Sequence, residues 1–301
     1  MAVVSAIITT FNRERFLGAA IQSVVAQAYG DFELLVLDNS SSDGTAALVG
    51  RFTDPRVRYL QHEPLSIAAA RNLGVRTARG EFVAFLDDDD EWLPAKLERQ
   101  VSAFRRAPAG VALVYGGFTR IDERGAAVGS HRPALRGRIL PALLAQRDAF
   151  TGSASNPMMR ADVLRALGGF NEALATSEDW ELYLRLAERY EVEYVPDELV
   201  RIRAHRDARL GDRIDDARKV EELVLERYGP RMSARLRSLY LRKIGGKLCR
   251  AGTIREGRAR IRQAIRIDPL NPVAYAQYGL SLLGTRAYGR VHGVFRRLRP
   301  G

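Results

Sequence analysis

The feature that most constrains the fold of this chain is an alternation of short apolar runs with amphipathic helical patterns. Apolar runs at residues 3–9, 32–37, 57–60 and 82–86 are typical of strands, and helical patterns follow them at residues 14–27, from residue 45, at 66–77 and from Pro94 to residue 106. Strands that alternate with helices in this way usually pair in parallel through crossover helices. The sequence therefore predicts an α/β fold, Rossmann-like, with a mostly parallel central sheet flanked by helices.

Polar side chains stand where three of these strands are expected to end. They are Thr9-Thr10, Asp38-Asn39 and the four consecutive aspartates at residues 87–90. Ligands of open α/β sheets bind outside the carboxyl ends of the strands. We therefore expect these positions to line one crevice.

The four aspartates are the most informative of these groups. Consecutive carboxylates after a buried strand repel one another unless a cation compensates them. Oxygen ligands suit Mg²⁺ or Mn²⁺, which proteins often hold with one or two carboxylates together with substrate phosphates. The alternative is a solvated acidic turn that stabilises the N-terminus of the helix after Pro94. A second acidic pair, Glu178-Asp179, opens a helical pattern that runs to residue 190, and such a pair is often only a helix N-terminus.

Five segments, in this order, resemble family 2 glycosyltransferases of the GT-A fold. They are Ala-Ile-Ile-Thr-Thr-Phe-Asn-Arg at residues 6–13, Leu-Asp-Asn-Ser-Ser-Ser-Asp-Gly-Thr at 37–45, Ala-Arg-Asn-Leu-Gly at 70–74, Phe-Leu-Asp-Asp-Asp-Asp-Glu-Trp-Leu-Pro at 85–94 and Ser-Glu-Asp-Trp-Glu-Leu at 177–182. The resemblance extends to about residue 205. It implies a nucleotide-sugar-dependent enzyme that inverts the anomeric carbon, with a UDP-sugar favoured as donor.

The resemblance also implies roles for residues around the donor. Thr9 and Asp38 would lie near the base and ribose, and Arg71 would reach the base or the phosphates. The chain departs from the family pattern at Thr9, where proline is common, and at Phe11, where tyrosine is usual. These departures concern the contacts to the base.

By the same resemblance, the acidic loop holds Mn²⁺ or Mg²⁺. Asp87 would face the ribose and the metal, and Asp89 would bind the metal itself. Four aspartates in a row leave the register open by one, so Asp88, also placed at the donor, and Asp90 are alternatives. His205 resembles a family histidine that approaches the metal or the diphosphate, although a lone histidine is more often structural.

Asp179 matches the general base of the family, with Glu178 as the neighbouring alternative. A sugar hydroxyl is a poor nucleophile, and a positioned carboxylate accelerates its attack by roughly 10²–10⁴-fold. The acceptor would be a saccharide or a lipid-linked sugar in cell-envelope or extracellular polysaccharide synthesis.

Two other functions fit the sequence less well. A nucleotidyltransferase normally has a glycine-rich basic loop after the first strand, and no GxGxxG or phosphate-binding loop motif stands there. A non-catalytic nucleotide-sugar-binding protein with a membrane- or nucleic-acid-binding tail is the second alternative. The presence of both Asp89 and Asp179 disfavours it.

The C-terminal part differs in charge from the rest of the chain. Residues 231–301 contain 17 lysines and arginines against two acidic residues, whereas the preceding 230 residues contain 30 against 34. We expect a catalytic domain at 1–214 and a basic helical extension at 215–301, with a hairpin of the tetratricopeptide kind at 256–283. The extension is either solvated surface or a peripheral attachment to an anionic membrane, and nucleic acid is not expected as a partner.

The expected location is the cytoplasm, with peripheral association at the inner face of the membrane. The single cysteine, Cys249, cannot form an internal disulfide. The first apolar run has no basic residues before it, so it reads as a strand and not as a signal peptide.

Overall fold

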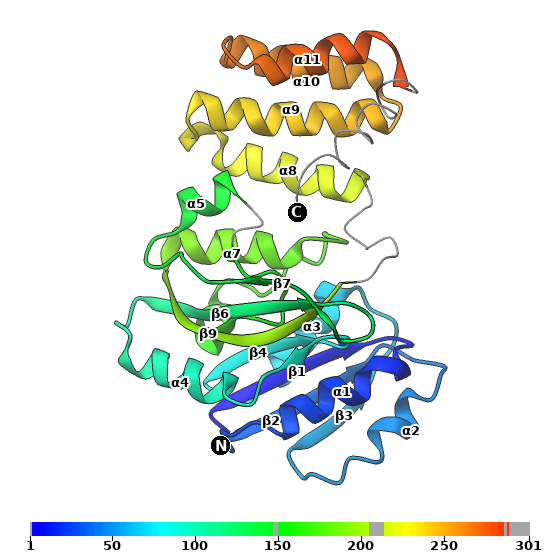
Figure 1. Cartoon of the computed structure of the whole chain (residues 1–301), viewed down its shortest axis with the longest axis vertical. Helices are drawn as coiled ribbons and strands as arrows, with labels where there is room; N and C mark the ends of the chain where they lie inside the picture. Colours follow the sequence, from blue (N-terminus) through cyan, green and yellow to red (C-terminus); the bar gives the residue numbers. More distant parts are fainter. Residues whose placement is uncertain (1, 147–149, 205–213, 286–287, 289–301) are drawn as a thin grey trace. The chain divides into compact units, whose positions relative to one another are not determined.

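The computed structural model describes residues 2–146, 150–204, 214–285 and 288, and the chain divides into two units, residues 1–207 and 208–301 (Figure 1). Each unit is described by itself. The domain boundary after residue 214 stays a prediction.

Four parallel strands form one half of the sheet in the first unit. They are β1 (Val4–Thr10), β2 (Phe32–Asp38), β3 (Val57–Gln61) and β4 (Phe82–Asp87), in the spatial order β3-β2-β1-β4. β1, β2 and β4 are buried along almost their whole length, which explains their continuous apolar runs, whereas β3 at the edge is only half-buried. The predicted α/β fold is confirmed in this half.

The other half of the sheet is mixed. β8 (Met158–Arg160) pairs antiparallel with both β4 and β6 (Val111–Ile121), and β6 pairs in parallel with β9 (Glu191–Arg203). A short strand, β5 (Glu91–Trp92), pairs with β9, and β7 (Ala127–His131) forms a hairpin with β6. The order along the sheet is β3-β2-β1-β4-β8-β6-β9-β5.

Residues 116–138 are rich in Gly, Pro and Arg, a composition that predicts irregular structure after a strand ending at Tyr115. This prediction is wrong in part, because β6 continues to Ile121 and β7 follows it. Gly116 shows the reason, because a Cβ atom there would lie 2.5 Å from Leu199 Cδ1. The glycine lets β9 pack closely on β6 and does not mark a loop.

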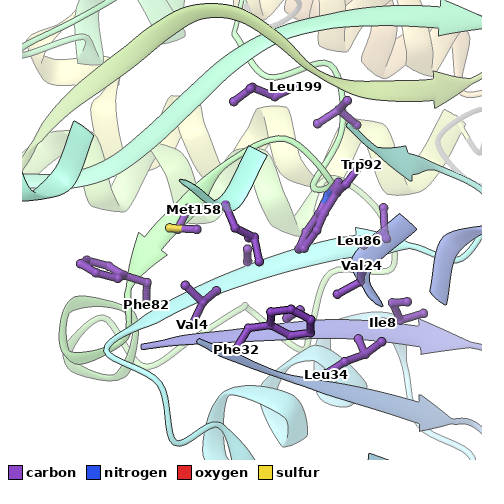
Figure 2. Packing of buried hydrophobic residues seen from close by; sticks show 14 of the residues in the cluster. Val4, Ile8, Val24, Phe32, Leu34, Phe82, Leu86, Trp92, Met158 and Leu199 are labelled. Carbon is purple, nitrogen blue, oxygen red and sulfur yellow. The ribbon is translucent and has the colours of Figure 1, made fainter. Parts of the chain in front are cut away.

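Helices cover both faces of the sheet. α1 (Glu14–Val25) and α4 (Lys96–Arg106) contribute to the main core cluster, which includes Val4, Phe32, Phe82, Met158 and Leu199 (Figure 2). α3 (Ile67–Thr77) packs on the opposite face, where a Cβ atom at residue 74 would lie 2.7 Å from a side-chain carbon of Ile7. The remaining helices of this unit are α2 (Thr45–Val49), α5 (Leu140–Ala145), α6 (Ala161–Ala166) and α7 (Glu178–Arg189).

All the regular elements that the structure describes in the second unit are helices, as the sequence predicts. It consists of α8 (Ile214–Tyr228), a 3₁₀ turn at Gly229–Arg231, α9 (Ala234–Arg250), α10 (Ile254–Ile267) and α11 (Pro272–Leu282). A small core of Cys249, Ile261 and Tyr288 lies among these helices. Among the described residues, no helix is both long enough and apolar enough to cross a bilayer.

Candidate active site

The ends of β1, β2 and β4 bring the predicted strand-end residues together. Thr10 is in register with Asp38 on β2, and Thr9 is in register with Asp87 on β4. The pairing follows from the parallel sheet, because strands that point the same way end at the same edge. The acidic loop therefore begins beside the polar end of β1.

Arg71 on α3 is the centre of an ion network at this edge. Its side chain is only 4% exposed, and its Nη2 donates to Asp87 Oδ1 at 2.7 Å while its Nη1 donates to Glu178 Oε1. The network joins α3, the end of β4 and the start of α7. A buried guanidinium of this kind is retained only with paired carboxylates, so the three side chains fix one another.

The four aspartates of the loop have different surroundings. Asp88 accepts a hydrogen bond from Thr10 Oγ1 at 2.8 Å, and Asp89 Oδ2 lies 3.8 Å from Arg13 Nη1. Asp90 is buried and accepts from the Ser155 hydroxyl at 2.6 Å and from the backbone N–H of Arg203 at 2.8 Å. Asp90 is thus held inside the protein as a structural anchor of the loop.

Burial is the main cause of the pKa shifts of these carboxyls. Burial raises the pKa of Asp87, although the Arg71 charge opposes the rise, and burial raises the pKa of Asp88 to about 7. Burial raises the pKa of Asp90 well above its usual range, and the charges of Asp87 and Asp89 raise it further. Burial likewise raises the pKa of Glu178. The carboxylates of the loop also raise one another's pKa by mutual repulsion, and a bound cation would oppose this repulsion.

The acidic loop supplies oxygen atoms of the kind that bind a hard divalent cation, but it does not form a complete coordination shell. No group of three or more His, Cys, Asp or Glu side chains converges as a complete metal cage in the portions of the chain that the structure describes. Mg²⁺ and Mn²⁺ often need only one or two carboxylates when water and substrate phosphates complete the shell. Asp87 and Asp89 supply carboxylates of that kind, and the charge of Asp89 acts on Asp87.

Asp38 is more enclosed than the sequence suggests. Its side chain is fully buried, with one oxygen accepting from the Tyr59 hydroxyl and the other from the backbone N–H of Ser41 at 2.9 Å. These bonds shape the loop that follows β2. The half-buried Thr9 lies at the same edge.

The start of α7 presents the second acidic pair. Ser177 precedes the helix with a left-handed backbone, at φ +65°. Glu178 is turned inward to Arg71, with 7% of its side chain exposed, whereas Asp179 is half-buried and accepts the N–H of Trp180 at 2.7 Å. The negative charges of Asp179 and Asp87 both act on Arg71. The two carboxylates of the pair therefore face different surroundings at one site.

Two residues of the site were not predicted from the sequence. Arg203, at the end of β9, donates from Nε to the carbonyl of Asp89 at 2.9 Å and from Nη2 to Glu91 at 2.9 Å. Ser155 accepts the backbone N–H of Asp87 at 3.0 Å and donates to Asp90. Ser155 stands in no motif, Arg203 lies in the Arg-Ile-Arg-Ala segment before His205 but had no predicted role, and both lie more than 60 residues from the loop in sequence. His205 lies outside the described residues.

Two curated comparisons bear on the family. The model of glycosyl transferase family 2 matches residues 5–168, more than half of the chain. An Escherichia coli relative, UDP-Glc:alpha-D-GlcNAc-diphosphoundecaprenol beta-1,3-glucosyltransferase WfgD, is 40% identical over 122 residues, which cover 40% of this chain and 47% of that protein. The chain spans 34% to 47% of the length of the first curated relatives that it matches.

Solved structures bear on the fold. The crystal structure of S. aureus TarS 1-349 in complex with UDP-GlcNAc matches with a TM-score of 0.67 at 15% identity. The match covers 99% of this chain and 92% of that chain. The mannosyltransferase PcManGT from Pyrobaculum calidifontis, in complex with GDP-Man and Mn²⁺, matches with a TM-score of 0.60 at 19% identity, covering 95% and 86%. At these identities the structures show the fold alone, and it is the GT-A fold. Together with the family match and the acidic loop at the end of β4, this places the chain in glycosyl transferase family 2.

Proposed function

We propose that this chain transfers a sugar from a nucleotide diphosphate donor, a UDP-sugar in the first instance, to a hydroxyl acceptor with inversion at the anomeric carbon. The observation that carries the proposal is the ion network of Arg71, Asp87 and Glu178. It ties the acidic loop to the start of α7 and so keeps Asp179 at the same site as the loop. The 40% identity to WfgD, whose printed name includes UDP-Glc, supports the choice of donor.

In the proposed reaction the acceptor oxygen bonds to the anomeric carbon as the bond from that carbon to the diphosphate breaks. Asp179 takes the proton that the acceptor hydroxyl loses, and the nucleoside diphosphate leaves on the opposite face. Arg71 and Glu178 act by position, because their buried ion pair fixes the helix turn that presents Asp179. A positioned base of this kind contributes roughly 10²–10⁴-fold to the rate.

Asp87 and Asp89 are the residues proposed to hold Mn²⁺ or Mg²⁺, with Asp88 at the donor. The cation, when bound, supplies positive charge next to the departing diphosphate. Asp90 is not proposed as a ligand, since Ser155 and the backbone of Arg203 already bind its carboxylate. Thr9 and Asp38 are proposed to lie near the base and ribose of the donor, and His205 near the metal or the diphosphate.

We propose a saccharide or lipid-linked acceptor and a role in cell-envelope or extracellular polysaccharide synthesis. The name of WfgD includes a diphosphoundecaprenol-linked sugar, which supports an acceptor of this class. Residues 1–214 would carry catalysis. The basic residues 215–301 would attract the protein to the inner face of an anionic membrane, from the cytoplasm.

The test measures release of nucleoside diphosphate from UDP-, GDP- and dTDP-sugars with Mn²⁺ or Mg²⁺, together with transfer to lipid-linked acceptors. Wild type is compared with Asp89→Asn and Asp179→Asn. The matched control is Asp162→Asn, because the Asp162 side chain is 66% exposed and its described contacts are with the nearby Arg160 and the backbone N–H of Val163.

We expect metal-dependent turnover by wild type and by the control. Asp179→Asn should lower kcat by roughly 10²–10⁴-fold with donor binding retained. Asp89→Asn should lose the response to metal. Turnover that survives both substitutions would refute the proposed site, and donor binding without turnover on any acceptor would favour the non-catalytic binding protein.

A further inference from the structure

The second unit exposes an unusual amount of apolar surface around α11. Five of the eight large hydrophobic side chains that are exposed in the described part of the chain lie between residues 270 and 283. Leu270 is 90% exposed, and α11 itself contains no charged residue. We call this set the α11 apolar face; its members are Leu270, Val273, Tyr275, Leu282 and Leu283.

The helix that carries this face does have packing partners on its other side. Ala274 and Ser281 are fully buried on the other side of α11, and Asn271 caps the helix by accepting the N–H of Ala274. Tyr275 and Leu282 are seven residues apart, which places them on the same side of the helix. α11 therefore packs through Ala274, Ser281 and the partly buried Tyr278 and Leu280, and leaves Val273, Tyr275 and Leu282 exposed to solvent.

A row of arginines on α10 reaches the C-terminal end of α11, where Leu282 and Leu283 follow Ser281 in the chain. Arg255, Arg258, Arg262 and Arg266 stand at i, i+3, i+7 and i+11, so they share one side of α10. Arg258 locates that side, because its Nη2 donates to the carbonyl of Ser281 on α11 at 2.6 Å. The other three arginines are exposed. We call the four residues the α10 arginine row.

We propose that the α11 apolar face and the α10 arginine row together bind the interface of an anionic lipid bilayer. Apolar side chains beside a basic helix face are the combination that enters the boundary between headgroups and acyl chains. Arginines at such a surface gain attraction from anionic headgroups that neutral lipid does not provide. Charge complementarity therefore identifies the occupant as anionic lipid.

Other occupants fit the charge or the apolar surface less well. A second copy of this chain would bring two strongly basic surfaces together, since residues 231–301 carry 17 basic residues against two acidic ones. A nucleic acid would pair its phosphates with the arginines but would leave Leu282 and Leu283 in water. Only a lipid interface uses both parts of the surface.

The inference deepens the proposed function, on which it rests for its link to a lipid-linked acceptor. It names the surface that would hold the enzyme at the membrane. Binding to vesicles can be measured without donor, acceptor or metal, so the two proposals fail separately. Turnover without vesicle binding would refute only the proposed lipid-binding surface. Vesicle binding without turnover would refute only the proposed reaction.

The experiment is co-sedimentation of the full chain with vesicles of phosphatidylglycerol mixed with phosphatidylcholine, and with vesicles of phosphatidylcholine alone. One variant combines Leu282→Gln with Leu283→Gln, and its control is Val128→Gln, an aliphatic residue 60% exposed on β7. A second variant combines Arg255→Gln with Arg262→Gln. Its control replaces the exposed Arg105 and Arg106 of the first unit in the same way.

We expect wild type and both controls to bind the anionic vesicles and to bind neutral vesicles weakly. The leucine variant should lose about tenfold in partitioning, because less apolar area enters the interface. The arginine variant should lose about tenfold on anionic vesicles at low salt. All variants should keep donor turnover and their melting temperature.

Three results would overturn the inference. Equal binding of wild type to anionic and neutral vesicles would remove the role of charge. Unchanged partitioning of the leucine variant would leave only a diffuse basic attraction. A leucine variant that dissociates an oligomer in solution, with its vesicle binding intact, would show that a second copy covers the face.

Discussion

Arg71 pairs with two carboxylates inside the protein, so its replacement tests the ion network directly. Arg71→Met leaves Asp87 and Glu178 without their buried cation. Breaking such a pair costs about 3–5 kcal/mol of unfolding free energy at a pH where both acids are ionised.

The loss of stability caused by Arg71→Met should be larger at alkaline than at acidic pH. Burial already raises the pKa of Asp87 and of Glu178, and Arg71 opposes both rises. Without Arg71 the folded state binds protons even more readily than the unfolded state, so stability falls as the pH rises. Urea unfolding of wild type and Arg71→Met should therefore differ less at acidic than at alkaline pH. A difference that grows on acidification would contradict the network.

Arg203 is the second residue with a testable role, as a positioning residue for the acidic loop. Its guanidinium is 8% exposed and reaches Asp89 and Glu91, whereas Arg201 is 51% exposed and lies 3.7 Å from the same Glu91. Arg203→Gln should weaken Mn²⁺ binding by roughly 10–100-fold, as loss of a group that orients metal ligands does. Arg201→Gln is the matched control and should leave Mn²⁺ binding nearly unchanged.

Titration calorimetry with Mn²⁺ alone separates this role from a general loss of stability, because it needs no turnover. Arg203→Lys keeps the charge but loses the forked geometry, and we expect only partial recovery. Equal Mn²⁺ affinity in wild type and Arg203→Gln would exclude the positioning role.

At the scale of elements, α7 depends on the backbone of one residue. Ser177 holds a left-handed conformation at φ +65° immediately before the acidic pair. Ser177→Gly and Ser177→Ala both remove the hydroxyl, and they differ only in the Cβ atom that disfavours this conformation. The glycine variant should be more stable than the alanine variant by about 1 kcal/mol.

The same pair of variants tests whether this turn positions Asp179. If the left-handed residue sets the direction of α7, Ser177→Ala should lower kcat more than Ser177→Gly, while donor affinity stays similar. Thermal unfolding and donor turnover measure the two effects. An alanine variant as stable and as active as the glycine variant would show that the conformation at residue 177 does not matter.

At the scale of the whole molecule, the chain has two units with separate cores. A ligand stabilises only the unit that binds it, in proportion to its concentration relative to Kd. If the first unit binds the donor, scanning calorimetry with UDP and Mn²⁺ should raise the transition temperature of that unit and leave that of the helical unit unchanged. A single transition that shifts as a whole would show that the units unfold together.

Much of the fold could be predicted because it depends on local periodicity. The apolar runs predicted β1, β2, β3 and β4, and the helical patterns predicted α1, α3 and α4, with ends that differ by a few residues. The wrong expectation for residues 116–138 has a tertiary cause. Gly116 and Gly117 are there because β9 approaches closely, and the sequence around them does not show β9.

The candidate site, like the fold, could be predicted from the sequence only in part. The sequence by itself determined that acids would stand at strand ends, because hydrophobic periodicity fixes where strands end and parallel strands end at one edge. Only the tertiary structure decided which acids are buried. It placed Asp90 against Ser155 and Arg203, and Glu178 against Arg71, since contacts between residues far apart in sequence set the desolvation and the partners of each carboxylate.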